Sequence, residues 1–277
     1  MTQQEQALRE YLRLLAKQGI CLAFSAGVDS SLLLQLACQE AAQMGQQVQA
    51  VIFATQLHPA ADVTLARQLC DQMGAVLHVV QVDEFSIPEV KYNASDRCYH
   101  CKKELFTQLK QTAQKLGCGV CMDGTNADDL KEYRPGLRAL KELGIVSPLA
   151  ELGITKAQVR QMAGELGISV AQRPSSPCLA TRLPYGAEVT PELLRRIERG
   201  ETRMKELGFP VVRVRVHGNI ARLEVPLEHL PALLEQRPQV VAGLKELGFN
   251  YITVDLEGFR SGSMDIGRSK EEDHGRT

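Results

Sequence analysis

The chain has 277 residues, of which 44% are hydrophobic and 23% are charged. These values exclude a disordered chain and a small disulfide-stapled protein, and the length favours two domains. The 32 basic and 33 acidic residues nearly cancel, and there is no tryptophan. Because a nucleic-acid binder typically has a basic excess and aromatic residues for base stacking, we expect no nucleic-acid partner.

The first ten residues are polar, and no apolar stretch reaches the roughly 18 residues that a membrane helix needs. The polar start does not resemble a secretory signal peptide, and the apolar stretches are too short for a membrane anchor. We therefore expect a cytoplasmic protein without a membrane partner. In that compartment the eight cysteines are more readily explained as thiols or metal ligands than as disulfides.

The first half of the chain alternates short apolar runs with helical patterns. Four apolar runs predict strands, at 20–24, 48–54, 75–82 and 120–123. Strands separated by helices are typical of βαβ units in a parallel sheet. Ligands of such sheets bind beyond the carboxyl ends of the strands, where residues 25–30 and 123–129 would lie.

A proline-rich segment, Arg173–Gly186, interrupts this pattern, and its prolines preclude a regular helix or a central strand. We place the domain boundary after it, with one domain at 1–186 and another at 187–265. The tail, 266–277, is charged and is expected to be disordered.

The second domain opens with a predicted helix at 190–207, in which Thr190 is the N-cap and Pro191 follows it. Strands are predicted at 211–216, 220–225 and 251–256, with helical segments before the last of them. This order predicts a small α+β domain with an antiparallel sheet.

Residues 25–31 follow the first predicted strand and open a helix. Main-chain N–H groups point outward at such a helix start, and the dipole adds roughly half a positive charge, so the segment favours an anion. Asp29 would repel an anion unless Mg²⁺ lies between them or Asp29 holds the loop by hydrogen bonds. An ordinary capped helix without a ligand is the alternative.

The segment Ser25–Ser30 resembles the SGGxDS loop of PP-loop ATP pyrophosphatases, and Asp123–Asp129 resembles their second nucleotide motif. The chain departs from the motif at Ala26, where glycine is usual, and a methyl group there predicts a negative φ. The resemblance implies ATP with Mg²⁺, which Asp29 would hold, and a Rossmann-like α/β fold. The residues that it places at ATP are Ser25, Gly27, Asp29, Ser30, Ser31, Gly124, Thr125 and Asp128.

The segment Pro177–Gly186, together with Arg213–Arg215 and Ala221–Glu224, is similar to the LarE family of ATP-dependent sulfur transferases. This resemblance implies a small nucleotide substrate, pyridinium-3,5-biscarboxylic acid mononucleotide. One of its carboxylates is adenylated and then converted to a thiocarboxylate, and the same two steps follow at the second carboxylate. The product leads to the nickel-pincer cofactor of lactate racemase. The resemblance also implies a sulfur donor, a nickel-inserting protein downstream and a homo-oligomer.

The cysteines divide into three groups. Cys21, Cys38 and Cys70 lie on the first strand or on apolar helix faces and are expected in the core. The pairs 98/101 and 118/121 have the spacing of zinc ligands. We disfavour a four-cysteine zinc site, because the second pair leads into a strand that a parallel sheet would bury.

The third group comprises Cys98, Cys101 and Cys178. Cys178 has the position of the sulfur-donating cysteine of the LarE family. Two versions of that chemistry stay open. In one, Cys178 gives up its own sulfur; in the other, the three cysteines hold a [4Fe–4S] cluster whose fourth iron carries sulfide, which this cysteine set favours.

Arginines mark a candidate substrate surface. Arg213 and Arg215 are two residues apart and project from one strand face, where guanidinium groups can bind phosphate or carboxylate. The alternative is an exposed face with salt bridges. Arg182 is expected to orient the anionic groups of the substrate together with Arg213 and Arg215. Lys102, next to Cys101, could lower the pKa of that thiol or contact a substrate phosphate. The resemblance places Glu201 and Glu224 near the active cysteine, where they could bind a metal or balance the arginines.

Three rival functions remain. The chain could be a tRNA thiolase, another adenylating PP-loop enzyme, or a non-enzymatic carrier of an iron–sulfur cluster or zinc. The balanced charge weighs against the first of these. The intact Asp29 and Ser30 weigh against a carrier.

Overall fold

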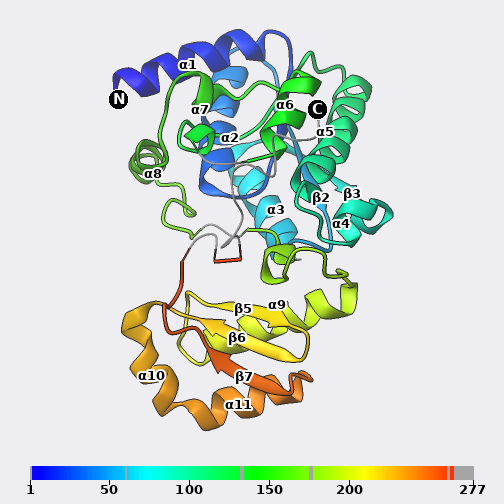
Figure 1. Ribbon diagram of the computed structural model, residues 1–277. Coiled ribbons are helices and arrows are strands. Elements are labelled where there is room, and N and C mark those ends of the chain that lie inside the picture. Colours follow the sequence, from blue (N-terminus) through cyan, green and yellow to red (C-terminus); the bar gives the residue numbers. More distant parts are fainter. Residues whose placement is uncertain (1, 60, 132–133, 175–176, 261–262, 265–277) are drawn as a thin grey trace. The chain divides into compact units, whose positions relative to one another are not determined.

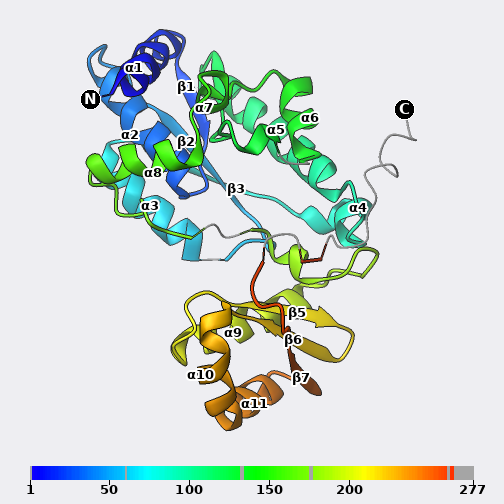
Figure 2. The same ribbon diagram turned by 60° about the vertical axis from the view of Figure 1, so that its left-hand side comes forward.

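The computed structural model describes residues 2–59, 61–131, 134–174, 177–260 and 263–264. They form two compact units, one from residues up to 90 and from 95 to 176, the other from 91–94 and from 177 onward (Figures 1 and 2). The expected boundary after residue 186 thus falls later than the observed division. The segment expected to be a disordered tail, 266–277, lies outside the described residues.

A parallel sheet forms the centre of the first unit, in the order β3-β2-β1-β4. The strands are β1 (Ile20–Ala23), β2 (Gln49–Ala54), β3 (Val76–Gln81) and β4 (Val120–Met122). All four predicted strands are confirmed, as is the α/β class. Among the described residues, no helix is long and apolar enough to cross a membrane.

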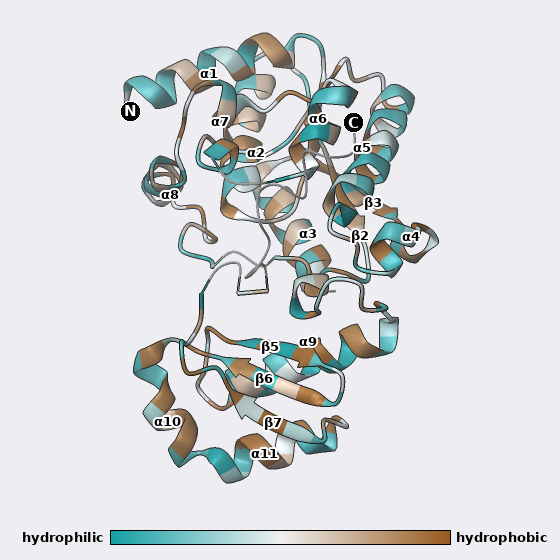
Figure 3. Ribbon diagram, viewed as in Figure 1, coloured by the Kyte–Doolittle hydropathy of each residue, from teal (hydrophilic) through white to brown (hydrophobic). Residues whose placement is uncertain are grey.

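Helices cover both faces of this sheet. The helices are α1 (Gln3–Ala16), α2 (Val28–Ala42), α3 (Ala61–Met73), α4 (Pro88–Lys91), α5 (Arg97–Lys115), α6 (Gly136–Leu143), α7 (Pro148–Glu151) and α8 (Lys156–Glu165). Side chains alternate along a strand, so Ile20 and Leu22 pack with α1, α2 and α8, whereas Cys21 packs with α5 and α6. Figure 3 shows the matching alternation of hydrophobic and hydrophilic residues along α1.

The second unit is a small sheet packed on helices. Its elements are η3 (Leu179–Arg182), α9 (Pro191–Glu206), β5 (Arg213–His217), β6 (Ile220–Glu224), α10 (Leu230–Glu235), α11 (Arg237–Glu246) and β7 (Tyr251–Val254). Thr190 caps α9, as expected, by accepting a hydrogen bond from the Leu193 amide. Val214 and Leu223 are buried on one face of the sheet, while Arg215 and Glu224 lie on the other.

The expected antiparallel sheet is only partly correct. β5 and β6 are antiparallel, but β6 and β7 are parallel. The chain between β6 and β7 forms two helices, α10 and α11, and such a crossover returns the next strand in the same direction. The sheet is therefore mixed.

One short segment joins the second unit from an earlier part of the chain. Asn93 has a left-handed φ of 47° and is fully buried. Its side-chain amide donates to the carbonyl oxygens of Leu183 and Pro184, at 3.1 and 2.8 Å. These bonds attach 91–94 to the proline-rich segment, which accounts for the earlier start of the second unit.

Candidate functional site

The loop between β1 and α2 is closed by its own hydroxyl groups. The Oγ atoms of Ser25 and Ser30 are 3.1 Å apart, and that of Ser30 donates to the Gly27 carbonyl at 3.2 Å. Gly27 is the N-cap of α2 and makes no side-chain cap, so the N-terminal amides of the helix keep their capacity for an anion. Ser31 is completely buried and does not line the cavity described below.

Ala26 differs from the expectation. Its φ is 53°, in the left-handed region, although a negative φ was expected for a residue with a methyl group. The tight turn from β1 into α2 imposes this conformation, and the carbonyl oxygen of Ala26 accepts a hydrogen bond from Arg173 at 3.2 Å. A left-handed alanine costs about 1–2 kcal/mol, which the surrounding fold offsets.

A second loop, which follows β4, lies directly against the first. A Cβ atom on Gly124 would lie 3.0 Å from the Ser30 amide nitrogen, so a side chain here would press the two loops apart and glycine suits this close approach. Thr125 is buried and donates to Asp123 at 2.5 Å. The Asp128 carboxylate accepts from the Lys156 amide at 2.9 Å, which ties this loop to the start of α8.

The role of Asp29 follows from its partners. One carboxylate oxygen accepts a hydrogen bond from the Asn126 side chain at 3.2 Å, and the other pairs with the Lys156 ammonium. Asp29 therefore connects the two loops with α8, which is the second of the two roles considered for it. A carboxylate suits Mg²⁺, but here the ion would have to displace Lys156.

A cavity of about 200 Å³ opens beside this loop. Its lining residues are Ser25, Gly27, Val28, Asp29, His58, Asp62, Lys156, Arg173 and Pro174. Ligand pockets commonly measure about 300–1,000 Å³, so this cavity suits one part of a nucleotide, such as its phosphates. The cations Lys156 and Arg173 face the same cavity as the serine loop and provide charge for such an anion.

Four ionisable residues of this cavity were not among the sequence candidates: His58, Asp62, Lys156 and Arg173. Arg173 pairs with Asp62 at 2.6 Å. Burial lowers the pKa of His58, and the nearby Asp62 charge partly opposes that shift. The available signals were weak: Lys156 follows a capping threonine and Arg173 opens the proline-rich segment, and neither pattern is specific for a ligand.

The candidate sulfur-chemistry residues are divided between the units. Cys98 and Cys101 lie on the first turn of α5 and share a helix face, with Cys98 exposed and Cys101 half-buried. Cys178 precedes η3 in the other unit and is half-buried. Within the part of the chain that the structure describes, no three metal-ligating side chains are gathered as a metal site.

Lys102 lies beside this pair of cysteines. Its side chain crosses Gly136, where an added Cβ would be 2.6 Å from the Lys102 Cδ atom. Its ammonium group is 5.7 Å from the centre of the Phe106 ring. Gly136 thus provides the space that determines the course of this side chain.

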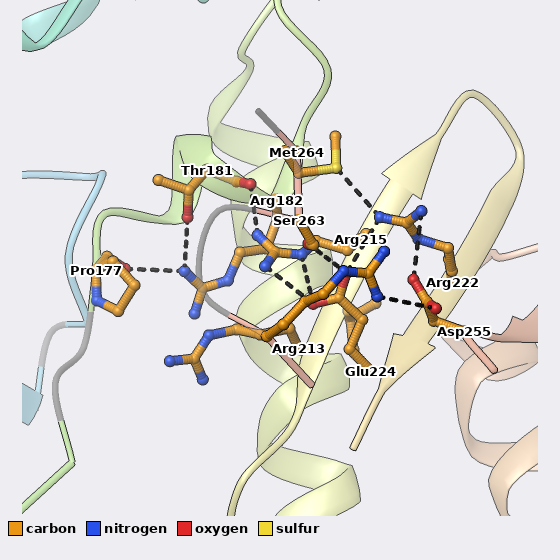
Figure 4. A network of polar contacts seen from close by, with 12 residues as sticks. Pro177, Thr181, Arg182, Arg213, Arg215, Arg222, Glu224, Asp255, Ser263 and Met264 are labelled. Atoms are coloured by element: carbon orange, nitrogen blue, oxygen red, sulfur yellow. Dashed lines mark hydrogen bonds and ion pairs between the residues drawn. The ribbon is translucent and has the colours of Figure 1, made fainter. Parts of the chain in front are cut away.

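Arg182 anchors the segment that carries Cys178. It makes two hydrogen bonds to Glu201, at 2.8 and 3.0 Å, and further bonds to the carbonyl oxygens of Pro177 and Cys178 (Figure 4). Arg182 is 1% exposed and Glu201 is 5% exposed. The guanidinium group therefore acts on the cysteine segment through its backbone.

A second ion-pair group occupies the polar face of the small sheet. Arg215 pairs with Glu224 at 2.9 Å, and Arg222 pairs with the same carboxylate at 3.1 Å. Ser263 donates to Glu224 at 2.6 Å, and Arg215 also donates to the Thr181 carbonyl (Figure 4). The expected salt-bridged face exists, but Arg215 and Glu224 are buried in it, and Glu224 is 0% exposed.

Arg213 differs from its neighbours. It is half-buried, and its guanidinium group lies 5.1 Å from the centre of the Phe259 ring. Burial, followed by the nearby Arg182 charge, lowers the pKa of Arg213 to about 10. An anion beside this side chain would favour its charged form and oppose that shift, so Arg213 remains a substrate candidate.

The expected core positions of the other cysteines are partly confirmed. Cys21, Cys38 and Cys70 are buried, as expected. Cys118 and Cys121 are half-buried rather than buried, because both line a cavity between α5, α6 and the turn into β4.

Comparison with known proteins places the chain among relatives of known sequence family. Residues 1–108 match the NAD synthase family. An uncharacterized protein of Synechocystis is 39% identical over 88% of this chain and 90% of its own length. A second uncharacterized protein, from Methanocaldococcus jannaschii, is 35% identical over 67% of this chain and 70% of its own length.

A third relative has a named activity. The pyridinium-3,5-bisthiocarboxylic acid mononucleotide synthase of Lactiplantibacillus plantarum is 35% identical over 89% of this chain and 89% of its own length. The match extends over 247 residues and therefore into both units. The chain therefore belongs to the LarE family of PP-loop proteins.

Proposed function

We propose that this chain is an ATP-dependent sulfur transferase that converts pyridinium-3,5-biscarboxylic acid mononucleotide to its bisthiocarboxylic acid. The carboxylate is first joined to AMP with release of pyrophosphate, and sulfur then displaces AMP. A carboxylate is a poor electrophile, and adenylation supplies it with a good leaving group. The product serves the nickel-pincer cofactor of lactate racemase.

One observation carries the proposal. The serine loop and the cations Lys156 and Arg173 line one cavity in a chain that matches the named synthase of Lactiplantibacillus plantarum over 89% of both lengths. Fixed N–H groups and cations stabilise the charge that develops on phosphates as pyrophosphate leaves. Mg²⁺ is the expected partner of those phosphates, with Asp29 as its ligand if Lys156 moves to the phosphates.

The arginines divide between two roles. Arg213 is the proposed contact for the phosphate or carboxylate of the substrate, with Lys102 as a second cation. Arg182 positions Cys178 by holding its backbone, and Arg215 positions the same segment through the Thr181 carbonyl. Glu201 and Glu224 hold those two arginines.

The sulfur chemistry is proposed to use a [4Fe–4S] cluster held by Cys98, Cys101 and Cys178. Three cysteine thiols are suitable ligands for such a cluster, since none of them is in a disulfide and all are at least partly exposed. The helical spacing of the first two also directs both thiols to one side of α5. A bound cluster with an open iron would carry sulfide from an external donor. The second candidate, a sacrificial Cys178, needs neither of the other cysteines.

A cytoplasmic location, a homo-oligomeric state and a downstream nickel-inserting protein complete the proposal. A small nucleotide substrate, rather than tRNA, is supported by the balanced charge of the chain.

The first experiment measures pyrophosphate release and thiocarboxylate formation by mass spectrometry. The purified chain is supplied with ATP, Mg²⁺, the biscarboxylic acid mononucleotide and sulfide. Pyrophosphate release that requires the mononucleotide supports the proposal. Release that requires tRNA instead, or no release at all, would overturn it in favour of a thiolase or a carrier.

A second experiment separates the two sulfur mechanisms. Iron and acid-labile sulfide are measured in anaerobically purified wild type and in Cys98→Ala, Cys101→Ala and Cys178→Ala. Iron in the wild type that each substitution removes supports the cluster. Iron-free protein that still forms product, with Cys178 converted to dehydroalanine, supports the sacrificial mechanism.

A further inference from the structure

A second cavity of the first unit contains cysteines that the proposed reaction does not use. It measures about 470 Å³. Its walls come from α5, α6 and the turn into β4, and Lys110, Cys118, Cys121 and Leu143 are among its lining residues. Cys121 therefore has access to small solutes from this side of the sheet.

A third cysteine lies next to Cys121. Cys21 on β1 and Cys121 on β4 are paired across neighbouring parallel strands, so their side chains project from the same face of the sheet. The two thiols are close enough for each to shift the pKa of the other. Neighbouring strands lie about 4.8 Å apart, which is within the Cα separation of about 4.4–6.8 Å that disulfides span.

The two thiols of this pair are unequal. Cys21 is 0% exposed, and the neighbouring Cys121 thiol, then burial, raises its pKa. The neighbouring Cys21 thiol and the Lys110 charge lower the pKa of Cys121, although burial opposes that shift. Cys121 is thus the more readily ionised thiol, and Cys21 is an adjacent protonated thiol. An accessible thiolate beside a second thiol is the usual arrangement of an oxidisable pair.

We propose that Cys121 is an oxidation site for hydrogen peroxide, and that Cys21 converts the oxidised form to a reversible Cys21–Cys121 disulfide. The Cys121 thiolate attacks one peroxide oxygen, the O–O bond breaks, and the departing hydroxide takes a proton to form water. The Cys21 sulfur then attacks the sulfenic sulfur of Cys121, and the displaced hydroxide takes the Cys21 proton as a second water. Two electrons pass from the two thiols to the peroxide.

Two other cysteines of the chain provide a contrast. Cys38 and Cys70 are also close enough to interact electrostatically, and burial raises their pKa values to about 12 and about 11. Both are buried, and neither lines the cavity. Cys38 and Cys70 are close to each other, but they are not accessible and their thiolates are not stabilised. We therefore expect peroxide to oxidise them slowly.

The disulfide would join the two strands that lead into the nucleotide loops. β1 ends before Ser25, and β4 ends before Asp123. The inference itself depends only on the cavity and the strand register, and it stands whether or not the proposed reaction is correct.

The test treats the full chain with a small excess of hydrogen peroxide, alkylates the remaining thiols and maps cross-linked peptides by mass spectrometry. We expect a Cys21–Cys121 cross-link that dithiothreitol removes. It should form at least about tenfold faster than any oxidation of Cys38 or Cys70, since thiolate fraction changes tenfold per pKa unit. No cross-link, or a Cys118–Cys121 cross-link in its place, would overturn the proposal.

Two variants test the role of Cys21 separately from the cross-link in the wild type. In Cys21→Ala, we expect Cys121 to persist as a sulfenic acid that dimedone labels, and Cys38→Ala is the matched control in which the wild-type cross-link forms unchanged. Dimedone labelling that is equal in wild type and Cys21→Ala would overturn the role of Cys21. The cross-link map of the wild type decides the proposal even if Cys21→Ala fails to fold.

Discussion

Two groups of cations, one in each unit, use the same residue types for different purposes. Lys156 and Arg173 line a cavity in the first unit, and their side chains are 33% and 32% exposed. Arg182 and Arg215 in the second unit are buried, and glutamates and backbone carbonyl oxygens accept their hydrogen bonds. All four cations are paired with carboxylates, so pairing alone does not separate the two groups. The difference teaches that a cation is a candidate ligand-binding group when part of its side chain stays open to a cavity.

The largest test of this comparison removes the charge that holds the buried arginines. In Glu224→Gln, Arg215 keeps its place but loses the counter-ion, and Glu224 is 0% exposed. Breaking a buried pair from one side costs about 3–5 kcal/mol, so we expect a loss of that size in the free energy of unfolding. Urea denaturation measures it.

The matched control for Glu224→Gln is Glu206→Gln. Glu206 pairs with Arg203 at 3.4 Å with its side chain 58% exposed, so we expect a change below about 1 kcal/mol. If the two variants were equally stable, the buried group would not stabilise the second unit.

The next test addresses the cavity cations. Lys156→Met removes a charge that faces the phosphate loop, and a hydrogen bond to a charged group contributes about 1.5–3 kcal/mol. We therefore expect ATP to bind roughly 10- to 150-fold more weakly. Isothermal calorimetry gives the affinity. Lys17→Met, at an exposed helix end, should leave it unchanged. An unchanged affinity in Lys156→Met would remove Lys156 from the site.

The free energy of unfolding, measured over a series of pH values, tests the environment of His58 in the same cavity. Burial lowers the pKa of His58 below its ordinary value of 6.5, so the folded state binds fewer protons than the unfolded state. Stability from this group is present above pH 6.5 and is lost as the pH falls through the lowered value. His58→Gln should reduce the slope of unfolding free energy against pH in that acidic window. An identical slope in both proteins would show that His58 does not titrate with folding.

The smallest expected effect concerns the strained loop. A left-handed alanine costs about 1–2 kcal/mol, and Ala26→Gly relieves that strain. The greater backbone freedom of glycine in the unfolded chain offsets about 0.5–1 kcal/mol of this gain. We expect a net stabilisation of about 0–1.5 kcal/mol, measured by thermal denaturation. Ala37→Gly, in the interior of α2, should destabilise instead. Destabilisation by Ala26→Gly would mean that the methyl group packs favourably.

Several expectations from the sequence depended on local patterns and were confirmed. The four strands of the first sheet, the Thr190 cap and the buried Cys21, Cys38 and Cys70 are of this kind. Hydrophobic periodicity and capping chemistry act over a few residues, so they are visible without the fold.

Other expectations depended on long-range packing. The sequence suggested that Arg182 and Arg215 contact substrate, yet their carboxylate partners lie on α9 and β6. The mixed sheet and the accessibility of Cys118 and Cys121 differ from expectation, because strand order decides the first and the packing of α5 and α6 around a cavity decides the second. Neither is written in a local pattern.

The sequence alone determined the α/β class, the serine loop and the resemblance to the LarE family, because each is carried by contiguous residues. Only the tertiary structure decided that Lys156 and Arg173 join that loop, and that Cys21 lies opposite Cys121. These side chains are brought together by chain folding over more than a hundred residues of separation or by strand register. Their proximity is therefore a property of packing rather than of local sequence.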